Sequence, residues 1–227
     1  MICYVKCLTS PGQFFVKCSL SPGGTGISRE GMIFFHLKHT IMFFLSRIKR
    51  NTGIMEVIYY MRNYYPLTAA QKMHHNWIMD YGTQQVSGVS VVASVQADLD
   101  FGLLKKCIQM EMERSDCTRV RFTKPDKDGN VKQYIEKQDP RDIELKDLSG
   151  MESLAKADEL MQQWAYETFD GDNIPMCEFT MLKLPEGYNG FFLHMDHRLI
   201  DSCGLVVMIG DLFQLYTHYK YGTACPQ

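Results

Sequence analysis

The residues best suited to chemistry lie close together in one short segment of the sequence. Residues 194–202 read His-Met-Asp-His-Arg-Leu-Ile-Asp-Ser, so that two histidines and two aspartates fall side by side. An imidazole with a pKa of about 6.5 can take a proton from an attacking amine or alcohol near neutral pH, and it needs no metal for this. The segment therefore predicts general-base chemistry by a histidine.

Two other chemistries would need residues that this segment lacks. A metallohydrolase of the H-x-H-x-D-H type would have a histidine at position 192, where the chain has Phe192, and no second group of ligands follows. A serine hydrolase would place its nucleophile in a G-x-S-x-G turn, whereas Ser202 lies in Asp-Ser-Cys-Gly, which is typical of a helix start. We therefore expect neither a bound metal nor a serine nucleophile.

The pair that remains is His197 and Asp201, which follows four residues later. His197 would act as the base, and Asp201 would hold the local backbone by pairing with a buried arginine. In the other interpretation, His197 is a structural histidine with satisfied hydrogen bonds, and Asp201 only caps a helix. The segment by itself leaves both interpretations open.

Regular patterns from residue 64 onward predict the elements that would hold this segment. They are a strand at 86–95, hairpins at 118–136 and 177–196, and helices that begin at Thr68, at Asp98 or Asp100, at a capping box Ser149-x-x-Glu152, and at Asp201 or Ser202. In the first helix, Ala70, Met73 and Trp77 recur on one face, as in an amphipathic helix. The chain is thus a mixed α/β protein, and the chemical segment lies where a strand gives way to a helix.

Composition limits the classes of protein to which the chain can belong. Its 227 residues are 45% hydrophobic, which is enough for a packed core, and its formal net charge of -2 argues against a dedicated nucleic-acid binder. The most apolar stretch, residues 32–45, contains His36, Lys38 and His39 and is shorter than the roughly 20 residues of a membrane span. The eight cysteines have no regular spacing and no signal-peptide pattern is present, so we expect free thiols and a cytoplasmic location.

Several short motifs occur in an order that resembles the condensation domains of nonribosomal peptide synthetases. They are the run 65–71 (Tyr-Pro-Leu-Thr-Ala-Ala-Gln), Asp98-Leu99-Asp100 with Leu103 and Leu104, the run 118–122 (Thr-Arg-Val-Arg-Phe) before Asp128-Gly129 and Gln133, then Phe169-Asp170, and the run 196–202. Each motif is degenerate on its own. The shared order over residues 64–221 is what carries the resemblance.

The resemblance implies both a fold and a site. The fold is chloramphenicol-acetyltransferase-like, a mixed α/β architecture of two lobes, each a sheet flanked by helices, with a tunnel between them that the phosphopantetheine arms of carrier proteins enter. The family's HHxxxDG motif falls on residues 196–202, which makes His197 the catalytic histidine and Asp201 the structural aspartate. The family arginine that pairs with this aspartate falls on Arg119, so an ion pair between Arg119 and Asp201 is expected.

Two positions depart from the family motif. Asp196 stands where the family has its first histidine, and Ser202 stands where it has glycine. A carboxylate at position 196 can orient His197 or point along the opposite strand face, and the Cβ of Ser202 hinders a backbone conformation with positive φ. These departures put the standard condensation reaction in doubt and fit a divergent, stand-alone acyltransferase.

The resemblance covers the amino-terminal lobe, because the family's second lobe, with its DFGWG-like segment, has no counterpart after Tyr221. It implies acyl transfer from a carrier-protein or coenzyme A thioester to an amine or alcohol, with no cofactor of the chain's own. Because the family's site lies between lobes, we expect the chain to be inactive unless a partner chain supplies the second lobe. The alternative is a non-catalytic module that docks a carrier protein or another subunit. Neither nucleic acid nor a membrane is expected as a partner.

Residues 1–60 differ in character from residues 61–227, which form the predicted lobe. They carry seven basic and two acidic residues, against a net charge of -7 in the rest, and they show no sustained periodicity. A basic tail for a membrane surface and a disordered extension are two interpretations. The third is a spurious extension, because residues 55–58 (Met-Glu-Val-Ile) can be encoded by AUG-GAG-GUG-AUU, which contains a ribosome-binding sequence ahead of Met61.

We favour the third interpretation and predict that translation begins at Met61. The intact mass of the natively expressed protein checks this prediction. A product that retains residues 1–60 would contradict it.

Overall fold

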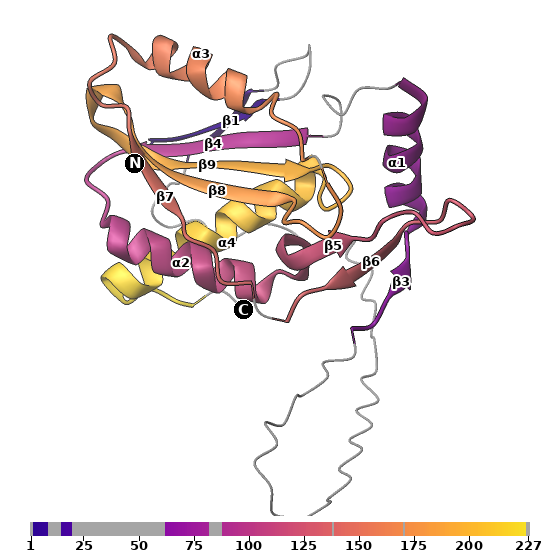
Figure 1. The fold of residues 1–227 in the computed structure, drawn as a ribbon. Coiled ribbons are helices and arrows are strands. Elements are labelled where there is room, and N and C mark those ends of the chain that lie inside the picture. The colour runs from indigo at the N-terminus through magenta and orange to yellow at the C-terminus, as the bar shows by residue number, and fades with distance from the viewer. Residues whose placement is uncertain are drawn as a thin grey trace, which may run out of the picture. The chain divides into compact units, whose positions relative to one another are not determined.

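A six-stranded β-sheet with helices on both faces forms the centre of the fold (Figure 1). The computed structural model describes residues 2–8, 15–19, 62–81, 88–137, 139–169 and 171–225, and for residues 2–8, 15–19 and 79–81 only the backbone. The strands lie in the order β2 (Phe15–Ser19), β1 (Ile2–Leu8), β4 (Gly88–Gln96), β9 (Tyr188–Asp196), β8 (Cys177–Lys183) and β7 (Glu144–Asp147). Neighbouring strands are antiparallel except β7 and β8, which are parallel. The predicted mixed α/β class is confirmed.

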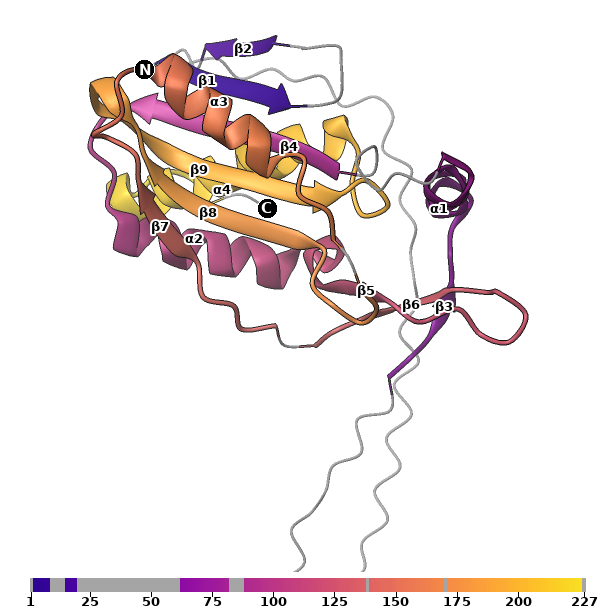
Figure 2. The same ribbon diagram turned by 45° about the horizontal axis from the view of Figure 1, so that its top comes forward.

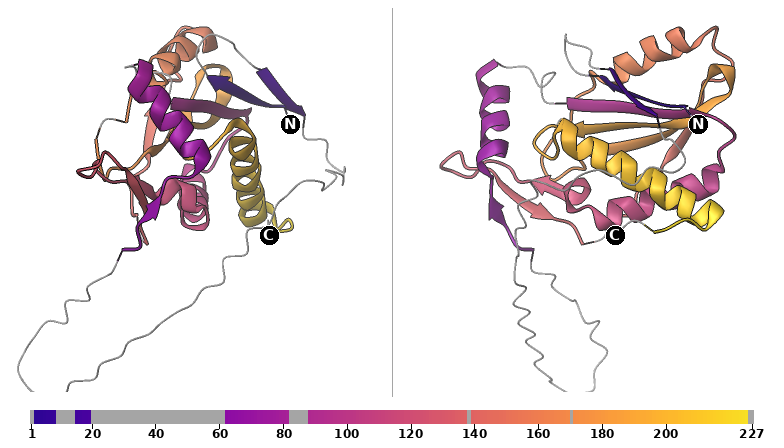
Figure 3. Two further views of the ribbon diagram at one scale, coloured as in Figure 1. Left: turned by 90° about the vertical axis from the view of Figure 1, so that its right-hand side faces the viewer. Right: turned by 180° about the vertical axis from the view of Figure 1, so that it is seen from behind.

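Alternate residues of β4 and β9 supply two separate hydrophobic cores. Three helices cover the sheet, with α2 (Phe101–Arg114) and α4 (Ser202–Tyr221) on one face and α3 (Leu154–Trp164) on the other (Figure 1 and Figure 2). Val91 and Leu193 belong to the core under α2 and α4. The rear view in Figure 3 shows the long helix α4 crossing the sheet. Val92 and Phe192 belong to the core under α3. Because strand side chains alternate between faces, neighbouring residues bury opposite sides of the same sheet.

Aspartates cap the two helices that flank the central strands. Asp100 accepts a hydrogen bond from the backbone N–H of Leu103 at the start of α2, at 2.9 Å. Asp201 accepts one from the backbone N–H of Gly204 at the start of α4, at 2.8 Å. Both bonds satisfy N–H groups that have no partner inside the helix. Of the alternatives that the sequence left open at these starts, the structure selects Asp100 and Asp201.

The start of α3 differs from the prediction. Ser153 caps the helix by accepting a hydrogen bond from the backbone N–H of Lys156. The predicted capping box of Ser149 and Glu152 was wrong, because Ser149 bonds instead to the carboxylate of Asp147 in the turn after β7. Ser149 is thus held in a turn by Asp147, two residues before it, and the next serine in the sequence, Ser153, caps the helix instead.

A second, three-stranded sheet supports α1 (Ala69–Tyr81). Its strands lie in the antiparallel order β3 (Tyr65–Pro66), β6 (Lys132–Ile135) and β5 (Val120–Phe122). Gly129 has a φ of 80° in the turn between β5 and β6, as the predicted hairpin requires. Thr68 and Gln71 each accept a hydrogen bond from the other's backbone N–H, and Gln71 and Gln133 exchange side-chain amide bonds at 2.7 and 2.8 Å. The predicted start of this helix is confirmed.

The predicted apolar face of α1 is not its buried face. Met73 and Trp77 are 58% and 51% exposed. His74 and His75 are half-buried instead. The inward side of this helix is therefore polar, because it meets a loop of charged and aromatic residues rather than a hydrophobic core.

Two strands fall in the amino-terminal region for which the sequence predicted no fold. Strand β1 pairs with β4, and β2 pairs with β1. The description of residues 1–60 as unstructured therefore does not hold for these two segments, because backbone hydrogen bonds can recruit a strand without a clear side-chain pattern. The apolar stretch 32–45 and the codon run at 55–58 lie outside the described residues, and the start at Met61 stays a prediction.

Gly190 and Gly210 form a matched pair of tests for the packing of β4 against β9. A Cβ added at Gly190 would lie 1.9 Å from the backbone oxygen of Ala93, whereas one added at Gly210 in α4 would meet nothing within 4 Å. We expect Gly190→Ala to lower the free energy of unfolding by about 1–3 kcal/mol or more, because the two strands must separate. Gly210→Ala should raise it by about 0.5–1 kcal/mol, because alanine favours the helix. Urea denaturation measures both, and equal midpoints would contradict this close approach.

Candidate active site

His197 lies in the short loop that follows β9, and its side chain is partly buried. Its Nδ1 atom is buried and has no hydrogen-bond partner among the described residues. One face of the ring stacks on His74 of α1, with the ring centroids 4.3 Å apart and the planes inclined by 21°. Because Nδ1 is enclosed, Nε2 is the ring nitrogen that can face a substrate.

Asp196, the last residue of β9, forms a buried ion pair with Arg198. Its Oδ1 accepts a hydrogen bond from Arg198 Nε at 2.9 Å, and its Oδ2 accepts one from Nη2 at 2.8 Å. Oδ1 also accepts the backbone N–H of Arg198 at 2.8 Å. The two partners stand on either side of His197 in the sequence, so this pair closes the loop that carries the histidine. The carboxylate of Asp196 therefore pairs with Arg198, and not with His197, which it was expected to orient.

The guanidinium of Arg198 connects this loop to three other parts of the fold. It lies 4.4 Å from the ring centroid of Phe122 in β5, and its Nη2 lies 3.4 Å from the sulfur of Met176. Its Nη1 lies 3.5 Å from Nδ1 of His75 in α1. A planar guanidinium can stack on an aromatic ring while its edge pairs with a carboxylate. Arg198 therefore fixes the loop against β5, the chain before β8, and α1 at once.

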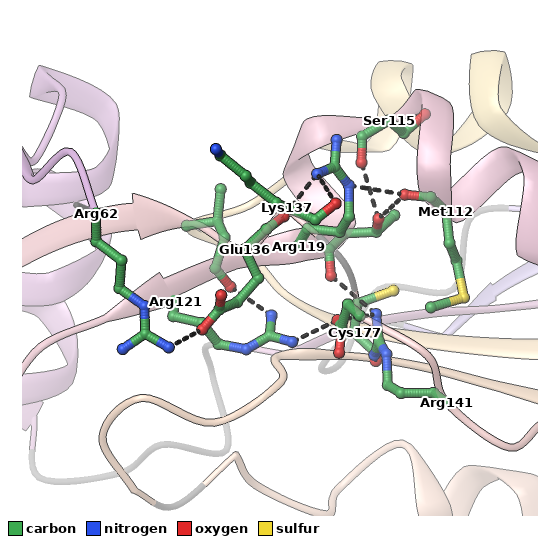
Figure 4. Close-up of polar contacts among 12 residues, drawn as sticks. Arg62, Met112, Ser115, Arg119, Arg121, Glu136, Lys137, Arg141 and Cys177 are labelled. Carbon is green, nitrogen blue, oxygen red and sulfur yellow. Dashed lines mark hydrogen bonds and ion pairs between the residues drawn. The ribbon is translucent and has the colours of Figure 1, made fainter. Parts of the chain in front are cut away.

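The expected ion pair between Arg119 and Asp201 is not formed. Arg119 instead binds the carboxylate of Asp116 at 2.5 Å and four backbone carbonyls, which belong to Met112, Glu113, Glu136 and Lys137 (Figure 4). The last carbonyls of a helix lack intrahelical partners, so a guanidinium just beyond α2 can satisfy them. Asp201 is exposed and caps α4. The structural role expected for this pair was therefore wrong.

Ser202, the second departure from the family motif, fits its place without backbone strain. Helix α4 begins at this residue. Among the described non-glycine residues, positive φ values occur at Asn173 and Glu186 only. The expected hindrance by a Cβ at Ser202 therefore does not arise, because a helical residue has negative φ.

His194, the other histidine of the segment, is a structural residue. Its Nε2–H donates to the backbone oxygen of Glu167 at 2.9 Å, so its Nδ1 accepts from the hydroxyl of Ser90 at 2.6 Å. The ring of Phe169 stacks on it, with the centroids 4.6 Å apart. Burial lowers the pKa of His194. A neutral ring with both nitrogens engaged cannot exchange a proton with a substrate.

The two histidines of α1 have pKa values below the usual range. Burial lowers the pKa of His74, and the neighbouring His197 lowers it further. Burial also lowers the pKa of His75, and the charge of Arg198 acts in the same direction. The carboxylate of Asp196 opposes both shifts. Both imidazoles are therefore largely uncharged at neutral pH, which allows α1 to lie beside the guanidinium of Arg198.

His74, His75 and Arg198 belong to this site, although no motif in the sequence singled them out. The signal available was a pair of adjacent histidines in the first helix and an arginine directly after His197. Hydrophobic periodicity predicted that the face of α1 with Met73 and Trp77 is buried, because the buried face of an amphipathic helix is usually apolar.

Two hollows in the described part of the chain are lined by residues outside the 194–202 segment. One of about 560 Å³ has Arg119, Lys137 and Arg141 in its wall. The other, of about 440 Å³, shares Arg141 and lies beside β8. Arg119 and Arg141 already donate to backbone carbonyls, as the close-up in Figure 4 shows. These arginines therefore serve the fold, and neither hollow contains the reactive segment.

A family model described as "Condensation domain" matches residues 61–227 of the chain. The chain belongs to the condensation-domain family. Subunits C and B of linear gramicidin synthase from Brevibacillus parabrevis are each 26% identical to it, over 69% and 66% of its length. The matched region is 2% and 3% of those subunits, so the chain spans only a small part of these relatives.

Solved condensation domains share the fold. A mutant starter condensation domain of the rhizomide synthetase RzmA, in complex with C8-CoA, has a TM-score of 0.65 at 17% identity and covers 72% of this chain. The first condensation domain of the calcium-dependent antibiotic synthetase, with a substrate analogue, has a TM-score of 0.61 at 19% identity and covers 73%. The matched regions are 38% and 41% of those solved chains. The expected fold class, a chloramphenicol-acetyltransferase-like lobe with a mixed sheet flanked by helices, is confirmed.

Membrane spans and metal sites are both lacking among the described residues. None of their helices is long and apolar enough to cross a membrane. They contain no group of three or more His, Cys, Asp or Glu side chains placed to hold a metal ion.

Cys177 is a free thiol, and burial raises its pKa to about 12, so it is a packing residue rather than a nucleophile.

Matched asparagine substitutions distinguish the observed ion pair from the expected one. Asp196→Asn should lower the free energy of unfolding by about 3–5 kcal/mol, because Arg198 loses its buried counter-charge. Asp201→Asn keeps a side-chain oxygen at the helix cap, so it should change the free energy of unfolding by no more than about 0.5 kcal/mol. Chemical denaturation measures both values. A larger loss at Asp201 than at Asp196 would restore the pair expected from the family motif.

Proposed function

We propose that this lobe takes part in acyl transfer from a thioester to an amine or an alcohol, with His197 as the general base. The donor thioester is carried on the phosphopantetheine arm of a carrier protein or on coenzyme A, and the chain holds no cofactor of its own. Membership of the condensation-domain family is the observation that carries the proposal. The resemblance of residues 196–202 to the family's HHxxxDG motif makes His197 the proposed base. The C8-CoA complex of a structural neighbour supports the choice of a thioester donor.

The partly exposed edge of His197 supports a proton-transfer role. In the proposed step, the substrate nitrogen or oxygen bonds to the thioester carbonyl carbon while Nε2 of His197 takes its proton. The carbon–sulfur bond then breaks, and the departing thiolate receives that proton as it becomes a thiol. The histidine thus begins and ends the cycle uncharged, as a general base should.

Because Nδ1 of His197 is buried, the role of the ring depends on which of its two nitrogens carries the proton. A base needs its lone pair on Nε2, which places the proton on an Nδ1 that has no acceptor among the described residues. An unpaired buried donor costs about 1–3 kcal/mol. The opposite tautomer would make Nε2–H a hydrogen-bond donor to the substrate. The two roles can be separated by a variant that keeps a donor but cannot act as a base.

A second lobe is part of the proposal. The matched regions are less than half of the solved condensation domains, so those proteins contain a large further part of the fold. We propose that such a lobe, in the same protein or in a partner chain, encloses His197 and excludes water from it. The 227-residue chain alone would then be inactive or nearly so. A cytoplasmic location remains part of the proposal.

The alternative is a non-catalytic module that docks a carrier protein or another subunit. The observation that favours it is the exposed apolar surface of β3 and α1, where Tyr65, Met73 and Trp77 are 45–58% exposed. Exposed aromatic side chains are common in docking surfaces. Binding of a carrier protein without any dependence on His197 would support this alternative.

An acyl-transfer assay on the chain combined with the second lobe of a condensation domain tests the catalytic proposal. The donor is an acyl thioester of coenzyme A or of a carrier protein, and product amide or ester is measured by mass spectrometry. We expect His197→Ala and His197→Gln to lower kcat by about 100-fold or more, because general-base catalysis contributes about 100- to 10,000-fold.

The glutamine variant serves as the control for the tautomer, since its amide can donate but cannot accept the substrate's proton. Near-normal turnover by His197→Gln would replace the base role with hydrogen-bond donation. Turnover that is unchanged in His197→Ala would remove His197 from the mechanism.

A further inference from the structure

The ring of His197 lacks the usual means of orientation. A catalytic histidine is commonly held by a hydrogen bond from its second ring nitrogen to a carboxylate or carbonyl. The second nitrogen of His197, Nδ1, is buried and has no hydrogen-bond partner among the described residues. The contact that remains is the stack with His74, at 4.3 Å and 21° between planes. A flat neighbour on the ring face restricts rotation about the last side-chain torsion of His197, which is otherwise broad.

We propose that His74 of α1 is a positioning residue for His197, and that its stacked ring directs the exposed nitrogen of His197 toward the substrate. The inference rests on the proposed function for its catalytic consequence. The stacking role itself concerns the two rings alone and can be measured without any reaction.

His74 can act in this way because α1 is anchored on both sides of it. On one side, Gln71 exchanges two amide hydrogen bonds with Gln133 of β6. On the other, His75 lies 3.5 Å from Arg198 in the loop that carries His197. The helix is thus fixed to the small sheet and to the catalytic loop at the same time, and His74 lies between these two attachments.

The surroundings of His74 favour an uncharged ring. The charged and titratable groups that act on it are His197, Asp196 and Arg198, all from the end of β9 and its loop. The ring of Trp77 in α1 also lies edge-on to it, with the ring centroids 6.2 Å apart. Burial and His197 lower the pKa of His74, so the ring carries little positive charge at neutral pH. An uncharged His74 ring can therefore stack on His197 without repulsion between charges.

Three variants on α1 separate stacking from other roles. His74→Phe keeps a flat aromatic face but cannot titrate, whereas His74→Ala removes the face. Asn76→Ala, at an exposed position of the same helix, is the matched control for effects on α1 itself. All three are made in the full 227-residue chain, and far-ultraviolet circular dichroism confirms that each is folded.

The first measurement is the proton spectrum of the His197 ring, assigned by its loss in His197→Ala. In the wild type and Asn76→Ala we expect an upfield ring-current shift from the stacked His74. The shift should be kept in His74→Phe and lost in His74→Ala. A His197 spectrum that is the same in wild type and His74→Ala would overturn the inference.

The second measurement is acyl transfer in the two-lobe assay. We expect His74→Ala to lower kcat by up to about 100-fold with little change in KM, as misplacement of a catalytic group does. His74→Phe should recover most of that loss. Full turnover by His74→Ala in an assay that depends on His197 would reject the positioning role and leave the proposed function standing.

The two measurements distinguish a failure of the proposed function from a failure of the stacking mechanism. If the wild type shows no acyl transfer while the ring-current pattern is as expected, the proposed function fails and the stacking contact is established. A loss of turnover in His74→Phe equal to that in His74→Ala would show that the imidazole itself, and not its flat face, is required, and would overturn the stacking mechanism.

Discussion

Strand β9 is paired with β4 along its full length and with β8 over seven residues. With both edges occupied, it cannot shift in register without breaking two ladders of hydrogen bonds. A shift of one residue would exchange the side chains that face α3 with those that face α2 and α4, because strand side chains alternate. The end of β9 is therefore a fixed point of the fold. The carboxylate of Asp196 is buried there, and the loop that carries His197 begins there.

Local charge pairing holds both the loop after this strand and the end of α2. Arg198 reaches back to Asp196, and Arg119 reaches back to Asp116 and to the carbonyls at the end of α2. In each case the partner is within a few residues along the chain, so little chain entropy is lost in forming the contact. The longer-range pair of Arg119 and Asp201 would have left the end of α2 unsatisfied and α4 without its cap. Satisfaction of helix ends thus accounts for the partners that Arg119 and Asp201 take.

The contact between α1 and the loop that carries His197 is of a different kind from the packing of the sheet. Its interface is made of imidazole rings, a guanidinium and side-chain amides, and no side chain described in α1 belongs to a hydrophobic core. Such an interface is directional, because stacking and hydrogen bonds depend on orientation while apolar burial does not. Met73 and Trp77 of the same helix are 58% and 51% exposed. Helix α1 therefore links the proposed site to a surface that another molecule can reach.

Local patterns in the sequence determined most of the elements. The alternation around Val91, the turn at Gly129, the cap at Thr68, and helix starts within one or two residues of Asp100 and Asp201 are short-range effects that do not need the rest of the chain. The motif order also identified the family and placed His197 at the end of a strand. The sequence could not show that His74 meets His197, that Arg198 replaces Arg119 as the partner of a motif carboxylate, or that β1 joins β4. Each of these depends on which surfaces come together in space, where competing partners are compared by distance, burial and the need to satisfy exposed backbone groups. Residue types and spacing therefore specify what this site contains, and tertiary packing decides how it is held.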